Sequence, residues 1–275
     1  MVDETACQAI FITGAASGIG RAVARYFAAR GWCVGLADVN AAGLAETAEM
    51  LPGKASSIHI LDVRDREAWD VALADFARFS KGRLDVLFNN AGIAHGGPLM
   101  DNTPAQIDDL IDINFKGVVN GARAAFPYLR DTPGSCLLNT ASAAALYGSA
   151  GFAVYSATKF AVRAMTEALE IEWLDANDSG GIKVRSLMPG FIDTPLLDGP
   201  SGNHTNISKR ERVIEAGLEF TPLEEVAQCA WDAVHRRKLH TLVGKTARQL
   251  GFAARWMPGR IRKRARGVMG AGRQG

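Results

Sequence analysis

The chain has 275 residues, of which 48% are hydrophobic and 22% are charged, and its net charge is +2. These proportions are ordinary for a globular protein, and they exclude a disordered chain, a collagen-like fibre and a disulfide-rich mini-scaffold. The net charge hides an asymmetry, because residues 1–232 carry −10 and the last 43 residues carry twelve Lys or Arg side chains and no acidic one. We therefore expect a main body, residues 1–244, and a basic tail, residues 245–275, with a role of its own.

Short apolar segments alternate with longer amphipathic segments along the chain. The predicted strands are 8–13, 33–37, 57–63, 85–90, 135–140, 182–188 and 240–244. The predicted helices are 19–30, 41–51, 65–79, 104–129, 154–176 and 221–236. Strands that are apolar on both faces and separated by single helices predict one α/β domain, in which a doubly wound parallel sheet of seven strands is covered on both sides.

The four cysteines, Cys7, Cys33, Cys136 and Cys229, lie far apart and form no CxxC pair. Each lies in or beside an apolar run, so we expect buried, reduced thiols in a cytoplasmic protein and no metal site. The N-terminal residues do not have the pattern of a signal or transit peptide. No run of about 18 apolar residues predicts a membrane span.

A glycine-rich segment, TGAASGIGR at 13–21, follows the first predicted strand and opens the first predicted helix. Gly14, Gly18 and Gly20 lie where the pyrophosphate of a dinucleotide meets a helix N-terminus in βαβ units. Glycine lets the backbone approach the phosphates and lets the helix pack close to the strand. The alternative is a tight turn without a ligand, which the position in the first βαβ unit disfavours.

Asp38 ends the second predicted strand, 18 residues after Gly20. A carboxylate at this position accepts hydrogen bonds from the adenosine ribose and repels the 2′-phosphate of NADP. Neither Ser17 nor Val39 supplies a base that would attract that phosphate. The sequence therefore favours NAD over NADP, the alternative being that Asp38 is a solvated turn residue.

Further motifs follow the glycine segment in order, and with it they resemble the short-chain dehydrogenase/reductase family. They are the TGxxxGxG spacing at 13–20, NNAG at 89–92, Asn114 in DINFKG, Ser142 after a predicted strand, YxxxK at 155–159, and Pro189-Gly190 with Thr194. The resemblance covers about residues 8–244. It implies a Rossmann fold and an NAD(P)-dependent oxidoreductase that acts on CH–OH groups and interconverts a primary or secondary alcohol with its aldehyde or ketone.

Tyr155 and Lys159 are four residues apart on a predicted helix, so both project from one face. A neighbouring ammonium is expected to lower the pKa of the phenol from its usual value of about 10. Such a pair suits proton transfer at an alcohol or carbonyl oxygen, although the spacing alone would also fit a surface contact.

The resemblance assigns roles to individual residues. Tyr155 is the acid or base, Ser142 holds the substrate oxygen, Lys159 binds the nicotinamide ribose, and Asn114 anchors a water that links Lys159 to solvent. Asp62 meets the adenine, and Thr194 contacts the carboxamide, although each could simply cap a turn. The implied cofactor site consists of Gly14, Ser17, Gly18, Ile19, Gly20, Asp38, Asp62, Val63, Asn90, Ala91, Gly92, Tyr155, Lys159, Pro189, Gly190, Ile192 and Thr194.

The substrate pocket is expected between residues 93–99, 143–152 and the segment after Gly190. Its side chains are mostly apolar, which predicts a hydrophobic, steroid-, retinoid- or acyl-like alcohol or ketone. Residues 193–220 lack periodicity until Lys209 and are expected to form a mobile lid. The other function classes are a catalytically silent dinucleotide-binding regulator and a protein that acts on membrane or nucleic acid through its tail. No nucleic-acid-binding motif supports the last of these.

We expect a homodimer or homotetramer that pairs through helices 104–129 and 154–176. These carry apolar residues beyond one stripe, namely Phe115, Val118, Val119, Phe126, Val162, Met165 and Leu169.

The tail is expected to form an amphipathic helix that Pro258-Gly259 breaks into two pieces. Its predicted apolar face consists of Leu250, Phe252, Ala254, Trp256, Met257, Ile261, Ala265 and Val268, and its basic stripe of Arg248, Arg255, Arg262 and Arg266. Two interpretations stay open. The tail lies on an anionic membrane as a peripheral contact, or it docks on the acidic body of the protein.

Overall fold

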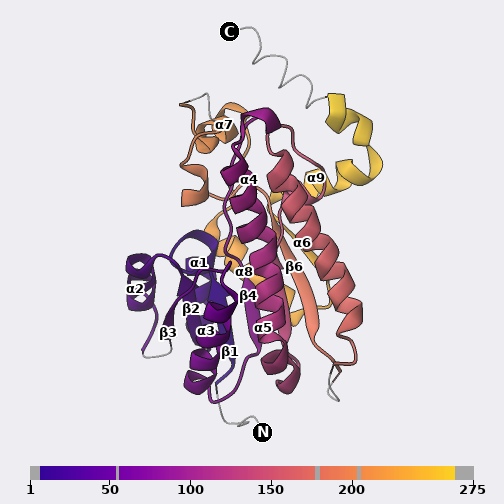
Figure 1. Ribbon diagram of the computed structural model, residues 1–275. Coiled ribbons are helices and arrows are strands. Elements are labelled where there is room, and N and C mark those ends of the chain that lie inside the picture. Colours follow the sequence, from indigo (N-terminus) through magenta and orange to yellow (C-terminus); the bar gives the residue numbers. More distant parts are fainter. Residues whose placement is uncertain (1–6, 54–55, 177–179, 203–205, 264–275) are drawn as a thin grey trace.

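The computed structural model describes residues 7–53, 56–176, 180–202 and 206–263 (Figure 1). A single sheet lies at the centre. Its strands are β1 (Ala9–Thr13), β2 (Cys33–Asp38), β3 (Ser56–Ile60), β4 (Val86–Asn89), β5 (Cys136–Thr140), β6 (Lys183–Pro189) and β7 (His240–Val243). All neighbours are parallel, in the order β3-β2-β1-β4-β5-β6-β7. The predicted doubly wound sheet of seven strands is confirmed.

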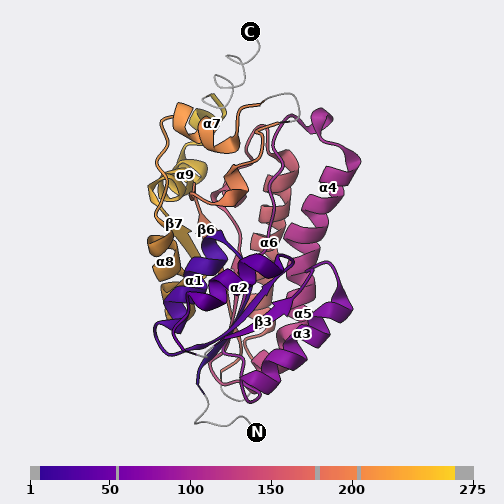
Figure 2. The same cartoon turned by 90° about the vertical axis from the view of Figure 1, so that its left-hand side faces the viewer.

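Helices cover both faces of the sheet (Figures 1 and 2). One face packs against α1 (Gly18–Ala28), α2 (Ala41–Glu49) and α8 (Leu223–His235). The other packs against α3 (Arg66–Phe79), α5 (Gly117–Asp131) and α6 (Ala153–Glu172). In β1, Ile10 and Ile12 enter the first core, whereas Ala9 and Phe11 enter the second. This alternation explains why the central strand is apolar at every position.

The helix predicted over 104–129 is interrupted. It begins as α4 (Pro104–Ile111), capped by Thr103, passes through a π-helical turn (Asp112–Lys116) and continues as α5. Asn114 lies inside that turn and is fully buried. A π-turn inserts one extra residue without a signal in the hydrophobic spacing, and such turns are frequent at functional sites.

Two of the four cysteines do not have the expected reduced form. Cys7 and Cys33 form a disulfide, while Cys136 and Cys229 are free thiols. The parallel pairing of β1 with β2 explains the bond, because Ala9 lies opposite Cys33 and the Cys33 N–H donates to the carbonyl of Gln8. That register places Cys7 beside Cys33, with their Cα atoms 6.1 Å apart.

The end of the molecule opposite the N-terminus carries the segments that follow β6 and β7 (Figure 1). Between β6 and α8 lie a short 3₁₀ turn, η4 (Pro195–Leu197), and α7 (Lys209–Glu215). After β7 comes α9 (Lys245–Trp256), and a further helical stretch, 258–263, follows a break at Met257. Within the described part of the chain, none of the helices combines the length and the apolar character needed to cross a bilayer.

Candidate active site

The glycine loop between β1 and α1 has a backbone conformation that favours glycine. Gly14 and Gly18 adopt φ values of +68° and +50°, which side chains other than glycine rarely tolerate. A Cβ atom on Gly20 would collide with the carbonyl group of Gly14. Ser17 precedes α1 without a side-chain cap, and the first turn of α1, which includes Ile19, holds no acidic residue. The positive end of α1 is therefore open to an anion.

Asp38 lies at the carboxyl end of β2, against this loop. Its Oδ2 accepts a hydrogen bond from the Ala16 N–H at 3.2 Å, and its Oδ1 accepts one from the Asn40 N–H at 3.0 Å. The nearby guanidinium of Arg21 donates to Glu46 and to backbone carbonyls, including that of Ala16. The Asp38 carboxylate is thus held at the loop, and the Arg21 guanidinium is engaged with other partners.

Asp62 and Val63 follow β3, which ends three residues earlier than the predicted strand 57–63. The Asp62 carboxylate is paired with Arg64 at 2.7 Å, and this hydrogen bond is the main reason why the pKa of Asp62 is lowered. Arg64 also reaches Asp109 at 3.2 Å. Val63 is buried, and its carbonyl accepts the indole N–H of Trp69. Asp62, which was predicted to contact adenine, is therefore already paired with Arg64 inside the protein.

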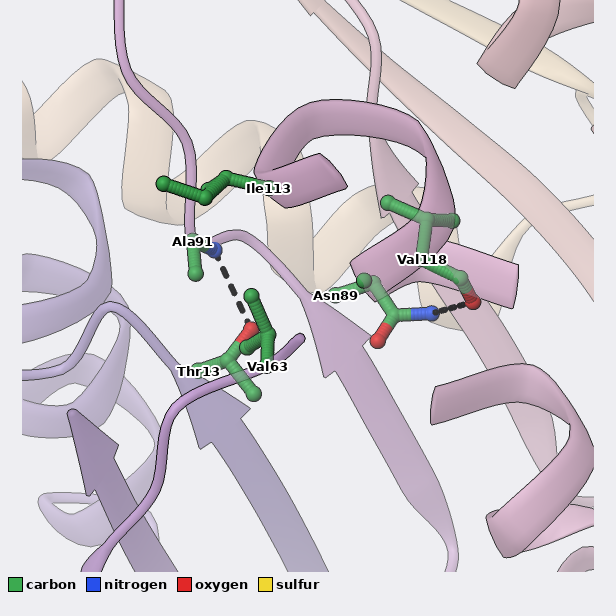
Figure 3. A pocket seen from close by; sticks show the side chains of 7 residues that line it. Thr13, Val63, Asn89, Ala91, Ile113 and Val118 are labelled. Carbon is green, nitrogen blue, oxygen red and sulfur yellow. Dashed lines mark hydrogen bonds between the residues drawn. The ribbon is translucent and has the colours of Figure 1, made fainter. Parts of the chain in front are cut away.

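Thr13 ties the glycine loop to the end of β4, a role that we did not predict. Its hydroxyl accepts the backbone N–H groups of Asn90 and Ala91, at 3.0 and 3.1 Å. Figure 3 shows the second of these bonds at the edge of a small pocket lined by Thr13, Val63, Asn89, Ala91, Ile113, Gly117 and Val118. The Asn90 amide in turn donates to the carbonyl of Thr13 at 2.9 Å. The signal for Thr13 was present in the sequence as the first residue of the glycine motif.

Ser142, Tyr155 and Lys159 meet where β5 ends. Ser142 caps a short 3₁₀ turn, η3 (Ala143–Ala145), and its Oγ accepts the Ala144 N–H at 3.1 Å. Tyr155 lies in the first turn of α6 and is hydrogen-bonded to the Ser142 side chain. Lys159 lies one turn later, and its Nζ donates to the Thr140 carbonyl at 2.9 Å. Parallel strands end at one edge of the sheet, which is why residues from three elements converge there.

Burial shifts the pKa values of Lys159 and Tyr155. It lowers the pKa of Lys159 to about 8, because a buried ammonium lacks hydration. It also raises the pKa of Tyr155, with the Ser142 hydrogen bond acting in the opposite direction. The expected lowering of the Tyr155 pKa by Lys159 is therefore wrong for this structure. The Lys159 ammonium lies 5.8 Å from the centre of the phenol ring and is directed to a backbone carbonyl.

Asn114 connects the π-turn to the loop after β4. Its Oδ1 accepts the Ile93 N–H at 2.8 Å, and its Nδ2 donates to the Ile93 carbonyl at 2.9 Å. A Cβ atom on Gly92 would lie 3.1 Å from the Asn114 Oδ1 and 3.5 Å from the Lys159 Nζ. The glycine of NNAG therefore permits Asn114 and Lys159 to approach the same stretch of backbone.

The segment after β6 closes against the glycine loop. Pro189 ends β6, and the Gly190 N–H donates to the carbonyl of Val243 at 3.1 Å. Ile192 is buried. Thr194 lies against Gly18, where a Cβ atom would be 3.1 Å from the Thr194 methyl carbon. Thus the predicted residues from the ends of β1, β4, β5 and β6 are brought together in space.

The segment predicted to be a lid contacts the loop after β4. Lys209, the first residue of α7, is buried, and its Nζ donates to the Ala94 carbonyl at 3.3 Å. Burial lowers the pKa of Lys209, and Asp198 opposes that effect. Gly96 packs so closely on the Ser201 carbonyl that a side chain there would clash. The lid segment therefore covers the region predicted to bind substrate.

Comparison with known proteins places these features in a family. The model of the short chain dehydrogenase family matches residues 8–202. The chain is 38% identical over 249 residues to a putative oxidoreductase, SadH, of Mycobacterium tuberculosis, which covers 90% of this chain and 89% of that protein. It is 34% identical over 226 residues to the 3-oxoacyl-[acyl-carrier-protein] reductase FabG of Thermotoga maritima. This match covers 79% of this chain and 86% of that protein.

Solved structures agree with these sequence matches. A short chain dehydrogenase/reductase from Burkholderia phymatum in complex with NAD superposes with a TM-score of 0.79 at 27% identity, covering 96% of this chain and 97% of that chain. A 3-ketoacyl-(acyl-carrier-protein) reductase from Brucella melitensis complexed with NADH has a TM-score of 0.75 at 27% identity, covering 87% and 98%. The chain belongs to the short-chain dehydrogenase/reductase family of oxidoreductases, which bind a nicotinamide dinucleotide.

Proposed function

We propose that the protein interconverts a hydrophobic primary or secondary alcohol and its aldehyde or ketone, with NAD as the hydride carrier. The observation that carries this proposal is the hydrogen-bonded pair of Ser142 and Tyr155 at the end of β5, with Lys159 buried one turn along α6. Two hydroxyls that meet at one point are suited to bind one substrate oxygen and to exchange its proton.

In oxidation, Tyr155 first loses its own proton to solvent through the route past Lys159, and its oxygen then takes the proton of the alcohol while the Ser142 hydroxyl holds the substrate oxygen. When bound, NAD would accept the hydride from the carbon that bears this oxygen, and NADH would return it in reduction. In reduction, Tyr155 gives its proton to the carbonyl oxygen. Lys159 provides a nearby positive charge and a route for protons, and Asn114 positions a water between Lys159 and solvent.

The glycine loop supports the choice of a dinucleotide, since Gly14, Gly18 and the open end of α1 form a cradle that side chains would fill. Asp38 supports NAD over NADP, because its carboxylate is held at the loop by the Ala16 N–H and would repel a 2′-phosphate. The other residues proposed to line this site are Ser17, Ile19, Asp62, Val63, Asn90, Ala91, Gly92, Pro189, Gly190, Ile192 and Thr194.

The substrate is proposed to be apolar because the segments around the site carry Leu146, Phe152 and Leu196. One relative is named meso-2,3-butanediol dehydrogenase and is 36% identical over 193 residues, which supports alcohol and ketone chemistry. The reductase names of other relatives support an acyl-like ketone.

Replacing Tyr155 by Phe tests the proposal. The variant Tyr155→Phe keeps the ring and removes the hydroxyl, so turnover should fall by about 10²- to 10⁴-fold or more. NAD binding should survive, since the glycine loop and Lys159 stay intact. The control is Tyr128→Phe in α5, which should keep full activity. Turnover is followed by nicotinamide absorbance with a panel of lipophilic alcohols and ketones. Near-full activity of Tyr155→Phe contradicts the mechanism, and a wild type inert towards the whole panel supports a silent regulator instead.

We also infer a homodimer or homotetramer, since family members commonly assemble. Of the residues expected to form the contact, Val118 and Val162 are buried in the protein's own core. The large apolar residues that α4, α5 and α6 expose are instead Ile111 on α4, and Phe160 and Ile171 on α6. These side chains are the proposed contact.

A further inference from the structure

The tail helix α9 has one docked face and one exposed face. Ala247 is fully buried, and Gly251 packs close to Leu242 of β7 and to Leu146. The opposite face exposes Phe252 and Trp256, at 61% and 65% of their full area. The sequence placed these two aromatic residues on the same apolar face as Leu250, Ala254, Met257 and Ile261. The structure separates them, since those four are partly buried and the aromatic pair is exposed.

The basic residues of the tail also form two groups, one paired with acidic residues of the body and one farther along the tail. In its first turn, Lys245 pairs with Glu219 and Arg248 with Glu225, at 3.6 and 2.9 Å. These two ion pairs fasten α9 to the body of the protein. Farther along, the guanidinium of Arg255 lies 5.4 Å from the ring centre of Trp256. Arg260, Arg262 and Lys263 follow and are exposed. The charged side chains that α9 and residues 258–263 expose beyond these ion pairs are therefore all cationic, and they accompany the two exposed aromatic side chains.

Exposed aliphatic side chains occur at the same end of the molecule. Met100 is 91% exposed and lies with the exposed Leu99 in a 3₁₀ turn, η1 (Leu99–Asp101), shortly before α4. Ile214 on α7 and Leu196 in η4 are also exposed. Both views place α7, α9 and the start of α4 at the end opposite the N-terminus (Figures 1 and 2). Exposed apolar side chains therefore occur on several elements at the same end of the molecule as α9.

We propose that this end of the protein docks on the surface of an anionic lipid bilayer, with Phe252 and Trp256 inserted at the headgroup level. Aromatic rings favour the boundary between headgroups and acyl chains, and arginines beside them are attracted to anionic lipids. The docked face of α9 keeps the helix parallel to the surface of the protein, so the contact is peripheral. This inference concerns a surface and does not depend on the proposed reaction.

Vesicle sedimentation tests the proposal with the full-length protein. Phosphatidylcholine vesicles are compared with vesicles of equal parts phosphatidylcholine and phosphatidylglycerol. The protein should bind the anionic vesicles, and binding should weaken as salt rises, because the charges are exposed. Trp256 is the most exposed of the five tryptophans, so tryptophan emission should shift to the blue on binding and should be quenched by brominated lipid.

Two pairs of variants locate the contact. The pair Arg262→Glu and Lys263→Glu should lower the vesicle partition coefficient by roughly 30-fold or more, because each base near the membrane contributes about 1 kcal/mol. The matched control reverses Arg237 and Lys238, an identical Arg-Lys pair just before β7, and should bind as the parent does.

The second pair, Phe252→Ser with Trp256→Ser, should lower binding by on the order of tenfold and abolish the blue shift. Its control is Val71→Ser, which removes a comparably exposed side chain from α3. Light scattering on the same samples reports oligomer size. A parent protein that does not bind anionic vesicles at low salt overturns the proposal, and so does an equal loss in the charge control. A changed oligomer mass in the aromatic variant, with vesicle binding intact, would assign this face to a second copy of the chain and also overturn it.

Discussion

Replacing Lys159 by Met should make the protein more stable at neutral pH while removing its activity. Burial lowers the pKa of Lys159 from 10.5 to about 8, so the folded protein holds a charge that it disfavours. At 1.36 kcal/mol per pKa unit, this shift corresponds to a cost of about 3 kcal/mol at pH 7. Met has a similar length and no charge. It loses the hydrogen bond to the Thr140 carbonyl, worth about 1 to 2 kcal/mol. The expected net gain is about 2 kcal/mol.

The pH dependence of the stability difference tests whether the buried charge of Lys159 causes it. Below pH 8 the lysine is protonated in both the folded and the unfolded chain, so wild type bears the full cost. Between pH 8 and 10.5 the unfolded chain binds one more proton than the folded chain, so the stability of wild type rises with pH. The advantage of Lys159→Met should therefore shrink over this range.

Denaturant unfolding of both proteins at a series of pH values measures the difference, and groups other than residue 159 contribute alike to both. Turnover should be lost at every pH. The reasoning is refuted if Lys159→Met is less stable than wild type at pH 7, or if the gap between the two proteins is the same at pH 7 and pH 10.

Two further predictions concern the cofactor and the disulfide. Asp38→Ala should weaken NAD binding by roughly 10- to 100-fold, the range for hydrogen bonds to a charged group, and should relieve the rejection of NADP. Catalytic efficiencies with NAD and NADP measure this preference, and a wild type that prefers NADP tenfold would contradict the prediction. Cys33→Ser opens a crosslink that spans 26 residues, which the chain-entropy relation values at about 3.5 kcal/mol. Calorimetry should therefore show Tm lowered by roughly 10 °C, and dithiothreitol should lower the Tm of wild type but not of the variant. A Tm equal to that of wild type would show that the bond does not constrain the unfolded chain.

The features that the sequence determined are those encoded by local spacing. Continuous apolar runs alternate with segments whose apolar residues recur every 3.6 residues, so the sheet and its two helical layers followed from patterns within single segments. Tyr155 and Lys159 share a helix face because they are four residues apart. Gly14, Gly18 and Gly20 lie where the first predicted strand leads into the first predicted helix, and a tight turn and close packing need glycine there.

Other features were decided only by contacts between distant segments. The π-turn at Asn114 is accompanied by two hydrogen bonds to Ile93, 21 residues away, and no spacing within 104–129 reveals it. The bond between Cys7 and Cys33 depends on the register of β1 against β2. The raised pKa of Tyr155 results from burial, which a sequence does not display.

The tail shows the same division. Its helical pattern and the break near Pro258 were evident from the sequence. The direction in which Phe252 and Trp256 point was not, because they lie at the edge of the apolar stripe and fit either face. The side of α9 that meets the protein depends on Leu146, Glu219 and Glu225, which lie in other parts of the chain. Local periodicity determines which residues share a face, and tertiary packing decides what that face contacts.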